Sequence, residues 1–275
     1  MLNVIGLIGY ALIGLAVGSF LNVVADRVPQ GQSLLRPPSH CPGCQRKLGV
    51  SELVPVFSYI ALRGRCRTCG ARIPLRVPLV ELATGLMFAL LWWTLGPSLW
   101  MVLNTLYASI LIVVFVIDLE HRLVLNVIII PAIVVAILAV LFQYVEGPTV
   151  AFVAFPALMF RSTNLTLVQL AMLSQLAGGL VAFGIFWLIW RINPDGMGYG
   201  DVRLAAFVGL ITGFPGALVA VFGSFVLGGV VALFLLIMRK VTRKAAIPFA
   251  PFLVIATLIM VVYGDRIIVW YLARI

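Results

Sequence analysis

The sequence predicts an all-α polytopic membrane protein of about eight transmembrane helices, with a small zinc-ribbon-like cytoplasmic insert after the first helix. Of its 275 residues, 63% are hydrophobic and only 10% are charged. A soluble core cannot hide so much apolar surface, so lipid must be the main solvent. Apolar runs of about 20 residues recur along the chain, the length that crosses a hydrocarbon core. The polar residues instead concentrate in residues 26–78.

Eight apolar runs are the expected helices. They cover residues 3–25, 79–95, 98–117, 123–145, 169–190, 202–214, 216–238 and 247–264. The first run is longer than the roughly 7–15 residues of a signal-peptide core, so we expect it to stay as a membrane helix. The sixth is short and interrupted by glycine. The predicted division is a first transmembrane helix at 1–25, the insert at 26–78 and a transmembrane core at 79–275.

The basic residues are concentrated in only some of the segments that connect the apolar runs. Sixteen of the 19 Lys and Arg lie in the insert and in the segments 118–122, 191–203 and 239–244, which eight spans place on one side. The positive-inside rule makes that side cytoplasmic and puts both termini outside. We therefore expect a multi-pass protein of the inner (cytoplasmic) membrane with the lipid bilayer as a partner. Topology and attraction to anionic headgroups explain the net charge of +10, so no nucleic acid partner is expected.

All four cysteines lie in the insert. Cys41, Cys44, Cys66 and Cys69 follow the pattern C-x2-C-x21-C-x2-C. Two such pairs supply four thiolates to a tetrahedral zinc ion and leave no open coordination position, so we predict a structural zinc. An insert with little hydrophobic core also needs a cross-link, such as a bound metal ion, to be stably folded. Two disulfides are the alternative, which a reducing cytoplasm disfavours. His40 is a possible replacement ligand but fits a loop histidine better.

Asp118 and Asp201 are the acidic residues that most need an explanation, because a carboxylate beside an apolar run is costly to dehydrate. Asp118 follows the third run, and Asp201 ends the segment Gly198-Tyr199-Gly200-Asp201. Taken singly, Asp118 fits an interfacial charge at a helix end, and Asp201 fits the N-cap of the sixth helix. Two spans separate them, so both acids lie on the same membrane face.

Two carboxylates that meet can share one proton, so that the pair holds an acid and a base at once. In the aspartic-protease arrangement the ionised partner deprotonates water and the protonated one donates to the scissile carbonyl. Gly198 and Gly200 would let a peptide backbone approach without a Cβ clash. The motifs of serine and zinc proteases are missing from the sequence. Glu81, Glu120 and Asp195 are expected to be helix-end charges, with Asp195 the next candidate.

Together these residues resemble the type IV prepilin peptidases, which are membrane aspartyl proteases with a Gly-x-Gly-Asp motif. The resemblance runs over nearly the whole chain. It is carried by the two Cys pairs and by residues 18–24, 55–59, 63–66, 78–82, 117–120, 196–204 and 247–252. It implies that Asp118 and Asp201 form a catalytic dyad that cleaves the basic leader from type IV prepilins or pseudopilins on the cytoplasmic side.

The resemblance also implies that the new N-terminal residue is methylated with S-adenosylmethionine. This rests on kinship alone, because the chain lacks a Rossmann glycine fingerprint. The apolar outer segment 146–168 is longer than a plain hairpin, and Ala250 stands where the family often has glycine. Two other classes of function are also compatible with the sequence. One is an ion-coupled transporter that uses the carboxylates as proton sites, which the broken sixth span favours. The other is a noncatalytic secretion or pilus assembly factor whose insert docks other proteins.

Overall fold

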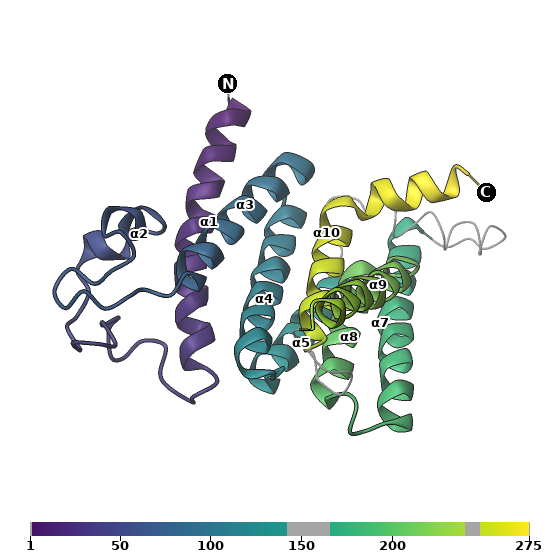
Figure 1. Ribbon diagram of the computed structural model, residues 1–275. Coiled ribbons are helices and arrows are strands. Elements are labelled where there is room, and N and C mark those ends of the chain that lie inside the picture. The colour runs from purple at the N-terminus through teal and green to yellow at the C-terminus, as the bar shows by residue number, and fades with distance from the viewer. Residues whose placement is uncertain (1, 142–165, 240–247, 275) are drawn as a thin grey trace. The chain divides into compact units, whose positions relative to one another are not determined.

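The computed structural model describes residues 2–141, 166–239 and 248–274, and these residues form helices and no extended sheet. Six of the helices are long and apolar enough to cross a membrane (Figure 1). They are α1 (Leu2–Arg27), α3 (Arg76–Leu95), α4 (Leu99–His121), α7 (Leu167–Ile192), α9 (Gly216–Ile237) and α10 (Ala250–Leu272). The prediction of an all-α polytopic membrane protein is confirmed.

The fourth and sixth predicted spans correspond to shorter helices. They are α5 (Asn126–Leu141), with 16 residues, and α8 (Tyr199–Thr212), with 14 residues. At about 1.5 Å per residue, α8 is roughly 21 Å long, which is less than the roughly 30 Å of a hydrocarbon core. Gly213 ends α8 with a φ of 61°, a conformation that glycine adopts without steric cost. The rest of the fourth predicted span and residues 146–165 of the predicted outer segment lie outside the described residues.

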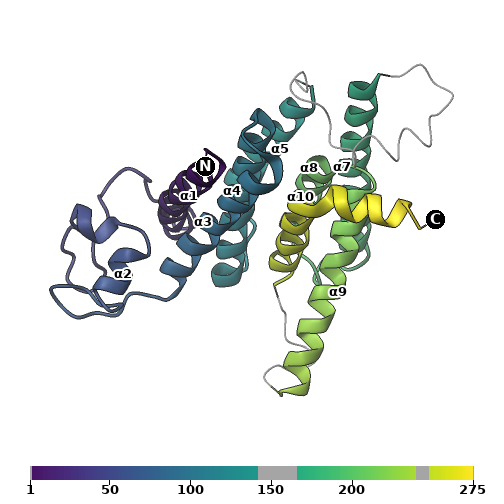
Figure 2. The same cartoon turned by 90° about the horizontal axis from the view of Figure 1, so that it is seen from above.

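The chain divides into two compact units, Met1–Val113 and Val114–Ile275. In the first unit, α1 packs against α3 through small residues. A Cβ at Gly14 would lie 2.8 Å from the Phe88 side chain, and one at Gly18 would lie 2.7 Å from the Glu81 Cα. Small residues allow this close approach of two membrane helices. The insert lies to one side of the α1 and α3 pair in both ribbon views (Figures 1 and 2).

In the second unit, α8 is the central helix and contacts α5, α7, α9 and α10. Most of its residues after Asp201 are buried. A helix that is surrounded by other helices has apolar residues around its whole circumference, as α8 has over this stretch. A Cβ at Gly178 of α7 would lie 2.5 Å from the Gly209 carbonyl oxygen, so α7 and α8 cross with no side chain between them. The Ser174 hydroxyl of α7 also donates to the Phe214 carbonyl oxygen at 2.7 Å. These contacts fix the C-terminal end of α8 against α7.

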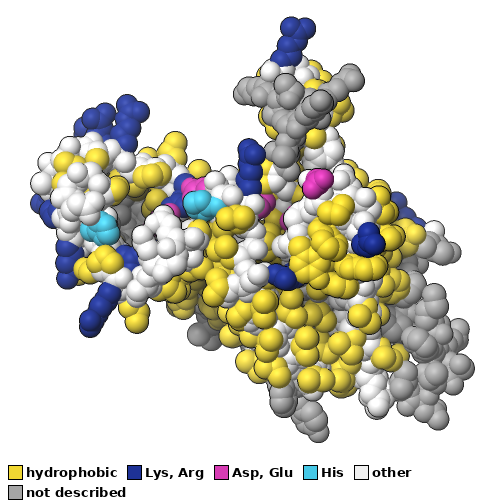
Figure 3. All heavy atoms as spheres, turned by 90° about the horizontal axis from the view of Figure 1, so that it is seen from below, with side chains coloured by type: hydrophobic (Ala, Val, Ile, Leu, Met, Phe, Trp, Pro, Cys, Tyr) yellow, Lys and Arg dark blue, Asp and Glu magenta, His cyan; other side chains and the backbone are white. Residues whose placement is uncertain are grey.

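The surface agrees with a lipid environment. Hydrophobic side chains cover broad areas of the face drawn in Figure 3. On α9 alone, large apolar side chains with more than half of their surface exposed are Phe222, Val230, Leu233, Phe234 and Ile237. An apolar surface of this extent marks contact with a membrane or another protein, and here it lies on helices of membrane-spanning length.

Candidate active site

Asp118 lies in the last turn of α4, because the helix continues to His121 instead of ending with the apolar run at residue 117. Only 5% of Asp118 is exposed. Asp118 thus lies at a helix end, as the interfacial-charge alternative expects, but it is buried. A carboxylate in such a position must find its partners within the protein.

The start of α10 supplies one such partner. The backbone N–H of Ala250, the first residue of α10, donates to the Asp118 carboxylate. Phe249, just before it, packs against the rings of Phe186 and Phe225 at centroid distances of 5.6 and 5.1 Å. This aromatic cluster fixes the start of α10, where free N–H groups and the helix dipole favour an anion. The other carboxylate oxygen, Oδ2, is buried and accepts no hydrogen bond from the described residues.

Asp201 is the third residue of α8, and Gly198 is the N-cap. The alternative that Asp201 itself caps the helix is therefore wrong. The Gly198 N–H instead donates to the Asp201 carboxylate. In a capping box, too, the side chain of the third helical residue accepts a hydrogen bond from the N–H of the N-cap residue. Asp201 lies outside the six candidate spans. Burial and then the charge of Asp118 raise the pKa of Asp201 to about 7, against the lowering effect of the Gly198 N–H. The two carboxylates thus lie within electrostatic reach of each other.

The two glycines of the predicted catalytic loop have different surroundings. A Cβ at Gly200 would lie 2.7 Å from the Val124 Cβ and 3.1 Å from the Val124 carbonyl oxygen. Val124 lies in the short connection between α4 and α5, directly after the turn that carries Asp118. Gly200 therefore lets the start of α8 lie against this connection. At Gly198 a Cβ would meet nothing closer than Asp201 Oδ2 at 3.7 Å, so this side of the turn is open.

Three further side chains hold the first turns of α8. The Tyr199 ring lies edge-on to Trp190 of α7, with centroids 5.0 Å apart. The Arg203 guanidinium lies 4.7 Å from the centroid of the Tyr199 ring and also donates to the Asn126 side chain at the start of α5. Trp190, Asn126 and Arg203 were not predicted to lie at the site. Only Arg203 had a signal in the sequence, its spacing of four from Tyr199, which puts both on one face of a helix.

The remaining acidic candidates do not join this site. Glu120 and Asp195 are exposed, as expected for helix-end charges. Glu81 belongs to the first unit, and the prediction that it is a helix-end charge is wrong, because only 5% of it is exposed. Its Oε2 accepts the Val56 N–H at 2.7 Å and so ties the insert to α3. Val56 has a φ of 62°, a rare conformation for a β-branched residue, which this hydrogen bond helps to hold.

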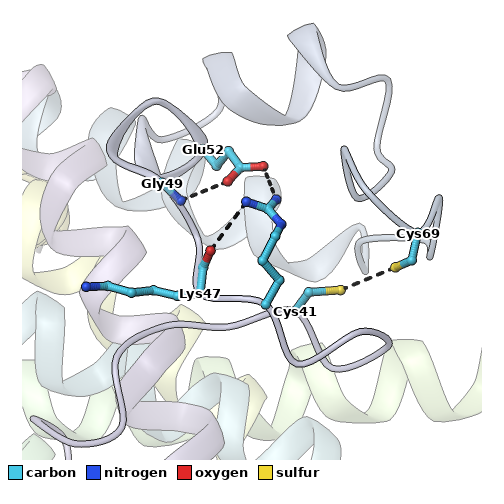
Figure 4. Close-up of polar contacts among 6 residues, drawn as sticks. Cys41, Lys47, Gly49, Glu52 and Cys69 are labelled. Carbon is cyan, nitrogen blue, oxygen red and sulfur yellow. Dashed lines mark hydrogen bonds and ion pairs between the residues drawn. The ribbon is translucent and has the colours of Figure 1, made fainter.

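The four cysteines form one cluster. Their Sγ atoms all lie within 4.8 Å of one another, and the sulfurs of Cys41 and Cys69 are 3.7 Å apart (Figure 4). A tetrahedral site with zinc–sulfur bonds of about 2.3 Å has sulfur–sulfur edges of about 3.8 Å. All four side chains are free thiols, not the two disulfides of the alternative. The cluster can therefore coordinate one metal ion.

The two Cys pairs have the same backbone geometry. The Cys41 carbonyl accepts the Gln45 N–H at 2.8 Å, and the Cys66 carbonyl accepts the Gly70 N–H at 3.0 Å. Gln45 and Gly70 share a left-handed conformation, with φ of 57° and 70°. Each loop is closed by one isolated antiparallel bridge, His40 with Lys47 and Arg65 with Arg72. This repeated loop is the zinc-ribbon-like insert that the spacing predicts.

The electrostatics of the cluster also fit a cation. The backbone N–H groups of Cys69 and Thr68 lower the pKa of Cys66 to about 6. The Ala71 N–H acts to lower the pKa of Cys69, but desolvation and the neighbouring sulfurs raise it to about 11. Four thiolates this close repel one another, so a bound dication is needed to ionise them all. Arg46, which is paired with Glu52 at 2.6 Å, also forms a hydrogen bond with Cys66.

The chain is similar to known proteins over most of its length. Residues 12–95 match the bacterial peptidase A24 N-terminal domain, and residues 105–233 match the type IV leader peptidase family. The chain is similar to three proteins named prepilin leader peptidase/N-methyltransferase. These are from Stutzerimonas stutzeri (30% identical; 95% of this chain and 92% of the relative), Bacillus subtilis strain 168 (29%; 95% and 96%) and Pseudomonas putida (31%; 93% and 90%). No solved structure matches the chain. Because these similarities span nearly the full length of both partners, the chain belongs to the type IV leader peptidase family.

Proposed function

We propose that this protein is an aspartic endopeptidase that removes the basic leader from type IV prepilins or pseudopilins at the cytoplasmic face of the inner membrane. The observation that carries the proposal is the electrostatic pairing of Asp118 with Asp201, two acids that are distant in sequence. A pair of carboxylates with perturbed protonation is a recognised acid and base combination. Membership in the leader peptidase family and the names of the relatives support the class of substrate.

A pair of acids that shares one proton has one base and one acid. Each carboxylate accepts one backbone N–H, Asp118 from Ala250 and Asp201 from Gly198, and we assign Asp118 as the base. Asp201, whose pKa is raised to about 7, is assigned as the acid. Asp118 takes a proton from a water molecule as the water oxygen attacks the scissile carbonyl, and Asp201 gives its proton to the carbonyl oxygen. The proton on Asp118 then passes to the leaving amine as the carbon–nitrogen bond breaks, and one hydroxyl of the tetrahedral intermediate returns a proton to Asp201 as the new carboxylic acid forms.

The arrangement of charges supports the location of the cut. Prepilins present a basic leader followed by a hydrophobic helix, so their cleavage point falls at the membrane surface. The positive-inside distribution of Lys and Arg favours a cytoplasmic position for the insert, Asp118 and Asp201, with both termini outside. The open side of Gly198 offers room for an extended peptide segment next to Asp201.

Two further parts of the proposal concern the cofactors. We infer that the metal ion of the cysteine cluster is zinc, held by Cys41, Cys44, Cys66 and Cys69, because four thiolates suit zinc and the cytoplasm is reducing. Zinc would supply structural cross-linking of the two loops and no open position for catalysis. The names of the relatives also favour N-methylation of the new terminus with S-adenosylmethionine. Peptide cleavage by Asp118 and Asp201 does not require that methyl donor.

Cleavage of a purified prepilin by the enzyme in nanodiscs tests the peptidase proposal. Asp118→Asn and Asp201→Asn keep the side-chain shape but remove one ionisable carboxyl, so each should lower the cleavage rate by roughly 10³-fold or more. The matched controls are Glu120→Gln and Asp195→Asn, which change exposed acids near each site and should cleave normally. Mass spectrometry of the product, with and without S-adenosylmethionine, reports leader removal and methylation separately.

The same variants separate the competing functions. If cleavage persists in either Asn variant, that residue does not belong to the dyad. If both variants still support pilus assembly, the protein is a noncatalytic assembly factor. Proton-coupled flux in liposomes without any proteolysis would instead favour the transporter.

A further inference from the structure

The insert carries an apolar face that the cysteine cluster does not use. It is formed by η1 (Val50–Leu53), α2 (Phe57–Ala61) and the residues between them. Its members are exposed large hydrophobic side chains: Val50, Leu53, Val54, Phe57 and Ile60. Phe57 and Ile60 are 61% and 66% exposed and lie three residues apart, so they share one face of α2. A polar insert that exposes this many large apolar residues in a row requires a partner to cover them.

The attachment of the insert sets the level of this face along the membrane helices. Val56, next to Phe57, is bonded to Glu81, and Glu81 lies against Gly18 of α1. Gly18 is nine residues before Arg27 at the end of α1, or about 13 Å along the helix axis. The apolar face is therefore attached next to the apolar part of α1, about two and a half turns before the helix ends at Arg27. Leu79 and Leu82, which flank Glu81 in α3, are 61% and 45% exposed.

Charge next to this face favours an anionic surface. The arginines at positions 63, 65, 67 and 72 follow α2 in the insert and are all exposed. The two acids of the insert are paired with other arginines, Asp26 with Arg76 and Glu52 with Arg46, both at 2.6 Å, and of the four only Arg67 also interacts electrostatically with Glu52. Lys and Arg side chains project from the insert in the space-filling view (Figure 3). Apolar residues with adjacent cations are typical of segments that lie in the plane of a membrane interface.

We propose that the apolar face of the insert is a membrane anchor that lies in the interface of an anionic bilayer. Phe57 and Ile60 enter the boundary between headgroups and acyl chains, and the exposed arginines bind lipid phosphates. The occupant is lipid because the face lies at the level of the apolar part of α1 and because exposed arginines follow it in the insert. The insert is then held by the Glu81 to Val56 hydrogen bond and by the lipid, while the metal cluster joins its own two loops.

Photo-crosslinking in the full-length protein tests the anchor. We would place p-benzoylphenylalanine at Phe57 in protein reconstituted into nanodiscs of phosphatidylethanolamine and phosphatidylglycerol, and identify the adducts by mass spectrometry. Gln32, an exposed residue of the insert outside both Cys loops, is the matched control position. Lipid adducts should be several-fold more abundant at position 57 than at position 32, with normal metal content in both proteins. Equal yields at the two positions, or a protein adduct at position 57 in place of lipid, would overturn the proposal.

A second measurement tests the charges without altering the apolar face. The double variant Arg63→Gln, Arg65→Gln should lower the share of phosphatidylglycerol among adducts at position 57. Each cation near an anionic surface is worth about 1 kcal/mol, which corresponds to about fivefold in binding. The total lipid yield should fall less than the phosphatidylglycerol share. An unchanged share of anionic lipid would contradict the proposed contact between these arginines and phosphate.

Discussion

Gly200 lies so close to Val124 that a Cβ at position 200 would be 2.7 Å from the Val124 Cβ. Gly200 directly precedes Asp201, and Val124 follows the helical turn that carries Asp118. This contact therefore joins the two chain segments that bear the acids. Because real Cβ atoms do not approach so closely, a side chain at position 200 must push the start of α8 away from the connection between α4 and α5.

Gly200→Ala should lower kcat/KM for prepilin cleavage by roughly 10²-fold, since a shift of about 1 Å in a catalytic group costs about that much. The matched control is Gly184→Ala in α7, where a Cβ would meet no atom within 4 Å, and this variant should cleave normally. Thermal unfolding of both variants separates misplacement from loss of fold. Normal kinetics in a folded Gly200→Ala variant would show that this packing does not position the dyad.

The rate of cleavage should fall as the pH rises through about 7. The pKa of Asp201 is raised to about 7, compared with about 3.9 for an ordinary aspartic acid. The folded protein therefore keeps this proton up to nearly neutral pH and loses it above that value. Without it the pair has no acid, so kcat/KM should decrease by about tenfold per pH unit on the alkaline side. A flat profile between pH 6 and pH 9 would argue against Asp201 as the acid.

Freshly purified protein should contain about one zinc ion per chain, because the cluster provides four thiolates. Cys41→Ser and Cys69→Ser should each remove most of this metal, as measured by elemental analysis and native mass spectrometry. His40→Ala should retain it, since His40 is exposed and lies outside the four-sulfur cluster. Metal-free wild-type protein, or full occupancy in the serine variants, would disprove the assignment.

Glu81→Ala should release the Val56 amide, while Glu81→Gln should preserve a carbonyl acceptor for it. A lost hydrogen bond of this kind costs about 1–3 kcal/mol, so amide exchange at Val56 should accelerate on the order of tenfold in the Ala variant. Hydrogen exchange of the full-length protein, read by mass spectrometry over residues 54–60, provides the measurement. Equal exchange in wild-type and Ala proteins would mean that Glu81 does not hold the insert.

Hydropathy and spacing were enough to predict most of the architecture. Runs of apolar residues predicted the six long helices because the bilayer demands a fixed length of apolar helix, whatever its neighbours. The Cys41 and Cys66 pairs predicted one metal cluster because ligand spacing is a local property. Hydropathy could not show that Glu81 is buried and bonded to Val56, because the two residues are 25 positions apart and Val56 has the rare φ of 62°.

The sequence by itself determined that this chain spans a membrane, that its cysteines form one cluster and that Asp118 and Asp201 both follow or precede apolar runs. Only the tertiary structure decided that Ala250 holds one oxygen of Asp118, that Gly198 caps the helix of Asp201 and that Val124 demands glycine at position 200. The physical reason is the range of the forces. Transfer from water to lipid acts on each segment separately and can be read along the chain, whereas hydrogen bonds and steric exclusion between distant segments exist only once the helices have packed.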